Sequence, residues 1–358
     1  MTGAVQCGVL LGDGIGPEIV PVAQKVLTAA AEAAGGAVEF VHLPVGFAAL
    51  DQYGTTFPDA VEEGLRKCDG WLMGPVDTAA YPSPTQGGLN PSGECRKRFQ
   101  LTSNVRPARA LPGVSCRFPE LDCVVVRENT EGFYADRSLL SGTGELPLRE
   151  GLALAVGVFS AERITEAMTE AMTIARGRRG RVALAHKANV LPATMGLYLR
   201  TARAMAAERP DITFESYHLD ALAAKIVEDP EEFDVIVAEN LGGDVLSDLT
   251  AGMVGGLGLA PSLNVGAEFA MAQAVHGSAP QIAGRGIANP SALVLSTAML
   301  LRWWAQRGVA SWGAAAATNI ENALAEALAS GDKTPDLGGE ASTEEFGDEL
   351  ARRVGALS

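Results

Sequence analysis

Three aspartates have types and spacing that suit a divalent metal. Asp244 and Asp248 lie four residues apart in NLGGDVLSD, so they share a face if this stretch is helical. Asp220, at the end of the strand-like FESYHLD, adds a third carboxylate. Three carboxylates make an oxygen-rich site of the kind that binds Mg²⁺ or Mn²⁺. The alternative is that these acids stabilise the start of a helix through its dipole, and the residues alone leave both interpretations open.

Three arginines have positions that suit the binding of carboxylates. Arg96 lies on a short expected helix, Arg106 lies in SNVRPAR, and Arg127 lies in VVVRENTEGFYAD. A guanidinium group binds a carboxylate through two parallel hydrogen bonds, which favours this role in an acidic chain. Each arginine taken alone is better explained as a surface salt bridge, so only the set favours an anion site.

Two further side chains are able to move protons. Tyr134 follows Arg127 in the same motif, and Lys187 in HKANVL comes just after an expected strand. A lysine can relay a proton, and a tyrosine can deliver one to a carbanion. The ordinary alternatives are an exposed lysine and a core tyrosine, and His186 is expected to be structural.

The elements that must position these residues follow an alternating pattern. Short β-branched or apolar runs alternate with longer stretches rich in Ala, Glu and Leu, which predicts an α/β protein. Several expected strands end directly in polar residues, and ligands of open α/β sheets bind at the carboxyl ends of strands. The expected strands are 5–11, 38–43, 70–73, 123–127, 181–185, 213–217 and 234–238.

The first strand runs into GDGIGPE and then into an expected helix over 18–34. The spacing G-x-G-x-G-P is not the G-x-G-x-x-G fingerprint of dinucleotide-binding turns, so we interpret these glycines as residues of a tight turn. A Pro/Gly/Ser-rich loop over 77–91 leads to an expected helix near 93–99. The basic run RGRRGR at 176–181 is expected to be a solvated helix end and turn.

Composition narrows the class of protein. The 358 residues include 28 Lys+Arg and 43 Asp+Glu, a net charge of −15, and 47% are hydrophobic, which indicates a folded protein of two domains or one large one. Strong negative charge argues against binding to nucleic acid or anionic membranes. The longest apolar stretch is too short for a membrane span, and no signal peptide is expected. Five cysteines without a C-x-x-C pair indicate reduced thiols and a cytoplasmic location.

Together the motifs resemble the β-decarboxylating dehydrogenases, which act on isocitrate, homoisocitrate, 3-isopropylmalate, D-malate or tartrate. The matching strings cover nearly the whole chain in the expected order. They are GDGIGPE, NVRPAR, VRENTEGFYAD, HKANVL, ENLGGDVLSDLTAGMVGGLGLAPS, HGSAPQIAGRGIANP and TPDLGG.

The resemblance implies an isopropylmalate/isocitrate dehydrogenase-like fold. Two α/β domains would share a central mixed sheet, and neither would be a classical Rossmann domain. Residues 1–100 plus 254–358 would form a large discontinuous domain on the cofactor side, and residues 101–253 a small domain with the dimer interface. The active sites would lie between the domains and be shared within a homodimer.

The resemblance also implies roles for individual residues. Arg96, Arg106 and Arg127 would bind the malate carboxylates, and Tyr134 would donate the proton to C3. Lys187 and Asp220 would project into the partner's cleft, where Asp220 joins the Asp244 and Asp248 of that subunit around Mg²⁺ or Mn²⁺. The residues that would bind the nicotinamide cofactor are Ile15, Asn189, Gly258, His276, Gly277, Ser278, Ala279, Gln281 and Asn289.

The residues before the first arginine bear on the substrate. Isopropylmalate enzymes resemble LLSLR there, with leucines that pack the isopropyl group. This chain has NPSGECR, in which Asn90, Ser92 and Gly93 lie six, four and three residues before Arg96. VRENTEG also looks like the isocitrate, homoisocitrate and tartrate branches. We therefore predict a 3-substituted D-malate with a polar or anionic substituent. The alternatives are 3-isopropylmalate dehydrogenase and tartrate or D-malate dehydrogenase.

Cofactor preference depends on one departure from the family pattern. NAD-using relatives carry Asp in HGSAPD, where the carboxylate repels a 2′-phosphate, but this chain has Gln281. Ile282 and TPDLGG still favour NAD, with NADP as the alternative. Gly242, where relatives often have a larger residue, has no interpretation.

Two non-enzymatic alternatives compete with the enzyme. A regulatory paralogue would lose catalytic residues, yet all of those expected are present. A metal-dependent anion-binding module would leave HGSAP and IANP unexplained.

Overall fold

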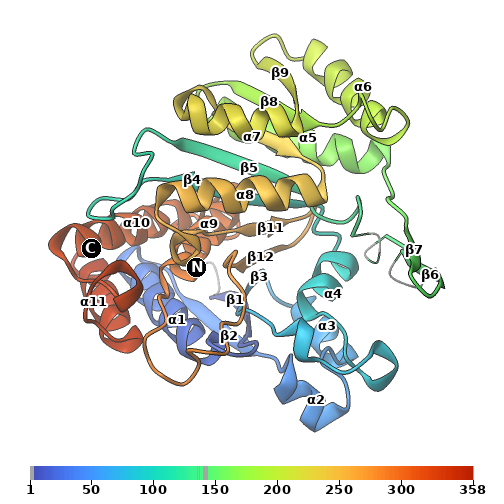
Figure 1. Cartoon of the computed structure of the whole chain (residues 1–358). Coiled ribbons are helices and arrows are strands. Elements are labelled where there is room, and N and C mark those ends of the chain that lie inside the picture. The colour runs from blue at the N-terminus through green and yellow to red at the C-terminus, as the bar shows by residue number, and fades with distance from the viewer. Residues whose placement is uncertain (1–3, 135, 137, 140–143, 358) are drawn as a thin grey trace.

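One large mixed sheet forms the centre of the molecule (Figure 1). The computed structural model describes residues 4–134, 136, 138–139 and 144–357. The sheet has ten strands in the order β2-β1-β3-β12-β11-β4-β5-β10-β8-β9, and β6 and β7 form a separate hairpin. The strands are β1 Val5–Leu10, β2 Val38–His42, β3 Gly70–Met73, β4 Ser103–Arg109, β5 Asp122–Glu128, β6 Glu145–Arg149, β7 Leu152–Ala155, β8 Arg181–His186, β9 Thr213–His218, β10 Val235–Ala238, β11 Leu263–Val265 and β12 Ala270–Gln273.

The seven predicted strands are confirmed, with ends that differ by at most one residue, while β4, β6, β7, β11 and β12 were missed. β11 and β12 have only three and four residues, too few for a clear apolar pattern. β4 contains Pro107, which argues against a strand in sequence. β11 pairs with β4 only at Ser103–Val105. At Pro107 no described strand lies on that side of β4, so the missing backbone N–H of proline costs no hydrogen bond there.

Helices cover both faces of the sheet, which confirms the α/β class. Alternate side chains of β5 pack on opposite faces of the sheet. Val124 and Val126 belong to the largest core cluster, together with residues of α5. Cys123 and Val125 belong to a second cluster, together with residues of α7 and α8. The helices are α1 Gly16–Ala33, α2 Phe47–Tyr53, α3 Asp59–Leu65, α4 Pro91–Arg98, α5 Ala161–Arg176, α6 Thr194–Ala207, α7 Leu219–Glu228, α8 Asn240–Val254, α9 Ser291–Gln306, α10 Gly313–Ser330 and α11 Thr343–Gly355.

The largest core cluster extends under α1, α9, α10 and α11, which pack together at the lower left of Figure 1. On the opposite face, a third cluster places Trp71 and Met73 of β3 against Val61 of α3 and Cys95 of α4. The strands β1, β2, β3, β11 and β12 come from outside residues 101–253, and the other five sheet strands come from inside that range. The division into two domains itself stays a prediction.

The turn after β1 requires glycine. Gly12 and Gly14 have φ values of +71° and +58°, a region that favours glycine. A Cβ on Gly14 would lie 2.0 Å from the carbonyl oxygen of Ser278, so this turn packs directly against the HGSAP segment. The interpretation of GDGIGPE as a tight turn is confirmed.

The β6 and β7 hairpin projects from the body of the molecule at the lower right of Figure 1. All the residues of both strands are exposed, including Leu146, Leu148, Leu152 and Leu154.

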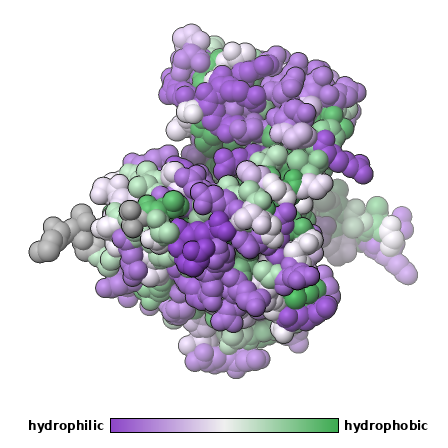
Figure 2. All heavy atoms as spheres, turned by 90° about the vertical axis from the view of Figure 1, so that its left-hand side faces the viewer, coloured by the Kyte–Doolittle hydropathy of each residue, from purple (hydrophilic) through white to green (hydrophobic). Residues whose placement is uncertain are grey.

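The face of the molecule in Figure 2 is mostly hydrophilic, with small scattered apolar areas. Among the described residues, no helix is long and apolar enough to cross a membrane, and all five cysteines are free thiols.

Two local expectations need correction. Asp220 does not end a strand, because β9 stops at His218 and Asp220 lies in the first turn of α7. The basic run at 176–181 is only partly solvated. Arg178 donates from Nε to the completely buried carboxylate of Asp234 at 2.8 Å, and the backbone N–H of Arg179 donates to the same carboxylate at 2.9 Å. The run therefore holds Asp234, the residue before β10, in place.

These contacts predict a large loss of stability when the buried carboxylate of Asp234 is removed. Asp234→Ala should lower the free energy of unfolding by about 3 kcal/mol, because the backbone and guanidinium donors lose a buried charged acceptor. Urea unfolding measures this change. The control is Asp211→Ala, which breaks an exposed pair with Arg176 and should have a much smaller effect. Equal effects of the two variants would contradict the structural role of Asp234.

Candidate active site

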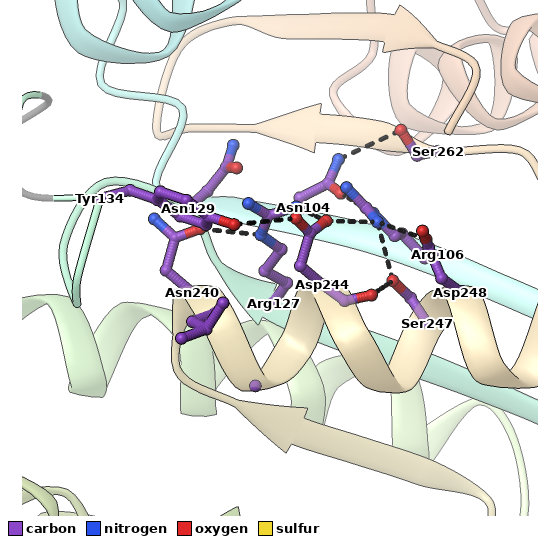
Figure 3. A network of polar contacts seen from close by, with 12 residues as sticks. Asn104, Arg106, Arg127, Asn129, Tyr134, Asn240, Asp244, Ser247, Asp248 and Ser262 are labelled. Carbon is purple, nitrogen blue, oxygen red and sulfur yellow. Dashed lines mark hydrogen bonds and ion pairs between the residues drawn. The ribbon is translucent and has the colours of Figure 1, made fainter. Parts of the chain in front are cut away.

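The carboxylates of α8 converge on an arginine of β4 (Figure 3). Asp244 and Asp248 lie one turn apart on α8, as their spacing predicted. Nη1 of the buried Arg106 lies 3.0 Å from Oδ1 of Asp244 and 3.4 Å from Oδ1 of Asp248. The same nitrogen donates to Oγ of Ser247 at 2.7 Å. Both carboxylates therefore point toward one small region above the sheet.

The second arginine approaches the same carboxylate from β5. Arg127 is also buried, and its Nη1 forms an ion pair with Oδ1 of Asp244. Nε of Arg127 donates to Oδ1 of Asn240 at 2.8 Å, which fixes the plane of the guanidinium. The Tyr134 hydroxyl lies 3.4 Å from Oδ2 of Asp244, and the tyrosine ring lies beside the Arg127 guanidinium at 5.5 Å.

Alternation along β4 and β5 explains how these arginines reach α8. Val105 and Val126, the neighbours of Arg106 and Arg127, belong to the core cluster on the α5 face. Successive side chains of a strand point to opposite faces, so the two arginines face α8.

Positive charge dominates the electrostatics of Asp244. Its burial opposes ionisation, but the charges of Arg127, Arg106 and Arg96 outweigh this and lower its pKa. The pKa of Asp248 is raised instead, first by burial and then by the neighbouring charge of Asp244, against the pull of Arg106. Asp244 is therefore ionised at neutral pH and balances part of the charge of the arginines.

Several residues that hold the arginines were not found from the sequence. Oδ1 of the buried Asn104 accepts a hydrogen bond from Nε of Arg106, and its Nδ2 donates to Asn264 at 3.0 Å and to Ser262 at 3.2 Å. Asn104 lies two residues before Arg106, but this spacing gave no usable signal because β4 was not recognised as a strand. Ser247 and Asn240 carried no such signal, since their contacts depend on how α8 packs on the sheet.

The helix α4 carries the first predicted substrate residues. Arg96 is buried on α4 and acts electrostatically on Asp244, so all three predicted arginines bear on one carboxylate. Asn90 caps the helix by accepting a hydrogen bond from the N–H of Gly93 at 3.1 Å. Ser92 is buried and donates to Oε1 of Gln273 at 2.8 Å. The structure thus gives the side chains of both Asn90 and Ser92 hydrogen-bond partners inside the protein.

Lys187 and Asp220 form a separate pair. Nζ of Lys187 donates to Oδ1 of Asp220 at 2.6 Å, which lowers the pKa of that carboxyl. The Asp220 side chain is 71% exposed, so the pair faces outward from α7 and the end of β8. Across the part of the chain that is described, no three His, Cys, Asp or Glu side chains are arranged to hold a metal. The predicted set of Asp220, Asp244 and Asp248 is therefore not assembled within one chain.

The two α8 carboxylates nevertheless fit a divalent cation. Both converge on the same nitrogen of Arg106, and carboxylate oxygens are the preferred ligands of Mg²⁺ and related ions. Because two carboxylates leave most of a coordination shell open, such a site would take further oxygens from substrate, water or a second copy of the chain.

A cavity of about 510 Å³ collects most of the predicted cofactor residues. Nε2 of His276 is buried without a hydrogen-bond partner among the described residues, and burial lowers the pKa of this ring. A bound polar ligand would satisfy this nitrogen, which fits the predicted role. Of the predicted set, only Asn189 is not among the lining residues; it is exposed after β8. The lining residues are Ile15, Gly258, His276, Gly277, Ser278, Ala279, Pro280, Gln281, Ile282, Ile287, Asn289 and Asp336.

Glu18 was missed as a support of this cavity. Its two carboxylate oxygens accept hydrogen bonds from the N–H groups of Gly284 at 2.5 Å and Gly286 at 2.9 Å. These contacts tie the start of α1 to the segment that follows the HGSAP residues. Since Glu18 belongs to GDGIGPE, the motif drew attention to its position, but only the folded chain shows what it holds.

The chain is similar to known dehydrogenases over nearly its whole length. The family model described as isocitrate/isopropylmalate dehydrogenase matches residues 6–350. The chain is 42% identical to an isocitrate/homoisocitrate dehydrogenase of Thermus thermophilus, covering 97% of each chain. It is 40% identical to the 3-isopropylmalate/3-methylmalate dehydrogenase of Methanocaldococcus jannaschii, covering 97% of this chain and 98% of that one.

Solved structures include a similar fold in the isocitrate dehydrogenase of Methylococcus capsulatus. That structure has a TM-score of 0.86 and 37% identity, with 98% of this chain and 99% of the other covered. The resemblance to the β-decarboxylating dehydrogenases is confirmed, together with the predicted fold. The chain belongs to the isocitrate/isopropylmalate dehydrogenase family, and it is a decarboxylating hydroxyacid dehydrogenase.

Proposed function

We propose that this enzyme oxidises and decarboxylates a 3-substituted D-malate with a polar or anionic substituent, using NAD and Mg²⁺ or Mn²⁺. The observation that carries the proposal is that two buried arginines, Arg106 and Arg127, contact Asp244 beside a second carboxylate. The charge of the buried Arg96 acts on the same Asp244. Arg96, Arg106 and Arg127 would bind the substrate carboxylates, and Asp244 and Asp248 would hold the metal. The bound metal would stabilise negative charge on the substrate oxygens.

The side chains of the protein would carry the proton transfers. Lys187, held by Asp220, would accept the proton of the C2 hydroxyl while the nicotinamide ring accepts the hydride from C2. The product of this step is a β-keto acid, which loses its C3 carboxylate as CO₂. Tyr134 would then protonate C3, and its hydroxyl beside Asp244 is placed within the arginine cluster.

These roles require a second copy of the chain, so we include a homodimer in the proposal. Lys187 and Asp220 face outward as an exposed pair, away from the carboxylates they would have to join. Exposed apolar side chains on α8 and in the turn after β8 would be covered by the second copy, namely Leu241, Val245 and Val190. The leucines of the projecting hairpin would be covered in the same way.

The polar substituent is supported by α4. Pro91–Arg98 carries no leucine, isoleucine or valine that would line a pocket for an isopropyl group. Gly93 adds no apolar side chain, and a Cβ there would press against the Asn90 side chain at 3.3 Å. The alternative substrate, 3-isopropylmalate, is favoured by the names of several similar relatives, such as those of Methanocaldococcus jannaschii and Archaeoglobus fulgidus.

A substrate panel tests the proposed specificity. Purified enzyme should reduce NAD with isocitrate or homoisocitrate at a higher kcat/KM than with 3-isopropylmalate. Tartrate and D-malate complete the panel, and the absorbance of the reduced cofactor is the readout. A clear preference for 3-isopropylmalate would show that the substituent is apolar.

Tyr134→Phe tests the proton donor. Loss of a general acid should lower kcat by about 100-fold or more, with little change in the KM of the substrate. Steady-state kinetics measures both constants. Tyr53→Phe, on the exposed face of α2, is the matched control and should behave as the original enzyme. An unchanged kcat in Tyr134→Phe would remove this tyrosine from the mechanism.

Cofactor preference can be tested at Gln281. It lines the cofactor cavity and is exposed, so a carboxylate there would face the adenosine side of the cofactor. The enzyme should prefer NAD, and Gln281→Asp should raise the preference over NADP by about tenfold through repulsion of the 2′-phosphate. Kinetics with both cofactors gives the ratio, and Gln52→Asp on α2 serves as the control. A large preference of the original enzyme for NADP would contradict the proposal.

A further inference from the structure

A second cavity, of about 290 Å³, lies apart from the active site. Its walls come from both the central and the C-terminal parts of the chain. β4 and β5 supply Val105, Pro107 and Val124, α5 supplies Ile174, and α9 supplies Leu295 and Met299. Most of the wall is therefore apolar, and residues 105–178 meet residues 251–321 across it.

The topology of the sheet explains why this cavity exists. β5 pairs with β4 over its whole length, but β11 reaches only as far as Val105. Beyond this point the edge of β4 is open, and its α5-facing side chains, Pro107 and Arg109, border the cavity. Arg106 points to the opposite face, toward α8. None of the predicted substrate, metal or cofactor residues lines this cavity.

The arginines at the rim of this cavity differ in whether they form an ion pair. Arg302 pairs with Glu321 at 2.8 Å, and Arg178 pairs with Asp122 at 2.8 Å. Arg109 is exposed at the rim, and within the described ranges it has no acid at ion-pair distance. Asp122 faces Arg109 across the two strands, but its carboxylate is taken by Arg178. One cation therefore remains available beside an apolar cavity, in a chain with a net charge of −15.

We propose that this cavity binds a small monocarboxylic acid with a compact apolar body, whose carboxylate pairs with Arg109. The volume lies at the low end of the range for ligand pockets, which fits a short aliphatic or single-ring group and is too small for a nucleotide. A guanidinium with free donors binds a carboxylate bidentately. A polyanion is disfavoured because Asp122 and Glu321 also border the cavity. The site is additional to the proposed catalytic function and does not depend on it.

Calorimetric titration of the full-length enzyme with 3-phenylpropanoate tests the proposal. The acid should bind, and 3-phenylpropanamide, which has the same shape without the charge, should bind about tenfold more weakly. Arg109→Gln should weaken binding of the acid by a similar factor. Met299→Trp should abolish binding of both compounds by filling the cavity. Arg209→Gln, which removes an exposed arginine just after α6, is the matched control and should bind as the original protein does.

A competition experiment separates this cavity from the substrate arginines. A saturating concentration of D-malate with Mg²⁺ should leave the affinity for 3-phenylpropanoate unchanged. Displacement by D-malate would place the probe at the active site and overturn the proposal. Equal binding of acid and amide, or unchanged binding in Arg109→Gln, would overturn it as well. This result is independent of whether the substrate panel succeeds, because it measures binding and not turnover.

Discussion

The arrangement of the active site depends on two buried guanidinium groups that share one carboxylate. Burial lowers the pKa of Arg106, and the nearby charges of Asp244 and Asp248 oppose this effect. Arg127 is also buried and bonds to the same Asp244. Two buried cations and one firmly ionised acid leave an excess of positive charge on the guanidinium groups. Such a site stabilises an anionic ligand, because the donors are already desolvated and oriented before the ligand arrives.

The long sheet keeps this unfavourable arrangement in place. Apolar neighbours on β4 and β5 anchor each arginine, since Val105, Val124 and Val126 are buried in the core on the other face. Asn104 and Asn240 then fix the guanidinium planes. The helix α8 follows the carboxyl end of β10, which brings its carboxylates to the same edge. The cofactor cavity also lies at the carboxyl ends of strands, where the Gly-rich turn after β1 packs against the HGSAP segment after β12.

Much of this could be predicted from local patterns. The strands 181–185 and 234–238 were recognisable because continuous apolar runs end at polar residues, His186 and Glu239. Asp244 and Asp248 share a helix face by spacing alone. β4 was not recognisable, because Pro107 and the polar residues around it obscure its alternation. Asp220 was placed on a strand because β9 and α7 join without a loop. Ser92 and Glu18 acquire their partners from segments far away along the chain, which no local pattern encodes.

The sequence by itself determined the α/β class, the family and the identity of the candidate chemical groups, because motifs and periodicity are local properties of the chain. Only the tertiary structure decided which groups interact, since Arg106 and Arg127 contact Asp244 from two different strands. The charge of Arg96, on α4, acts on the same carboxylate. The tertiary structure also showed that Lys187 and Asp220 pair at the surface, apart from the other carboxylates. Burial and distance set the strength of each of these interactions, and both arise only when the strands assemble into one sheet.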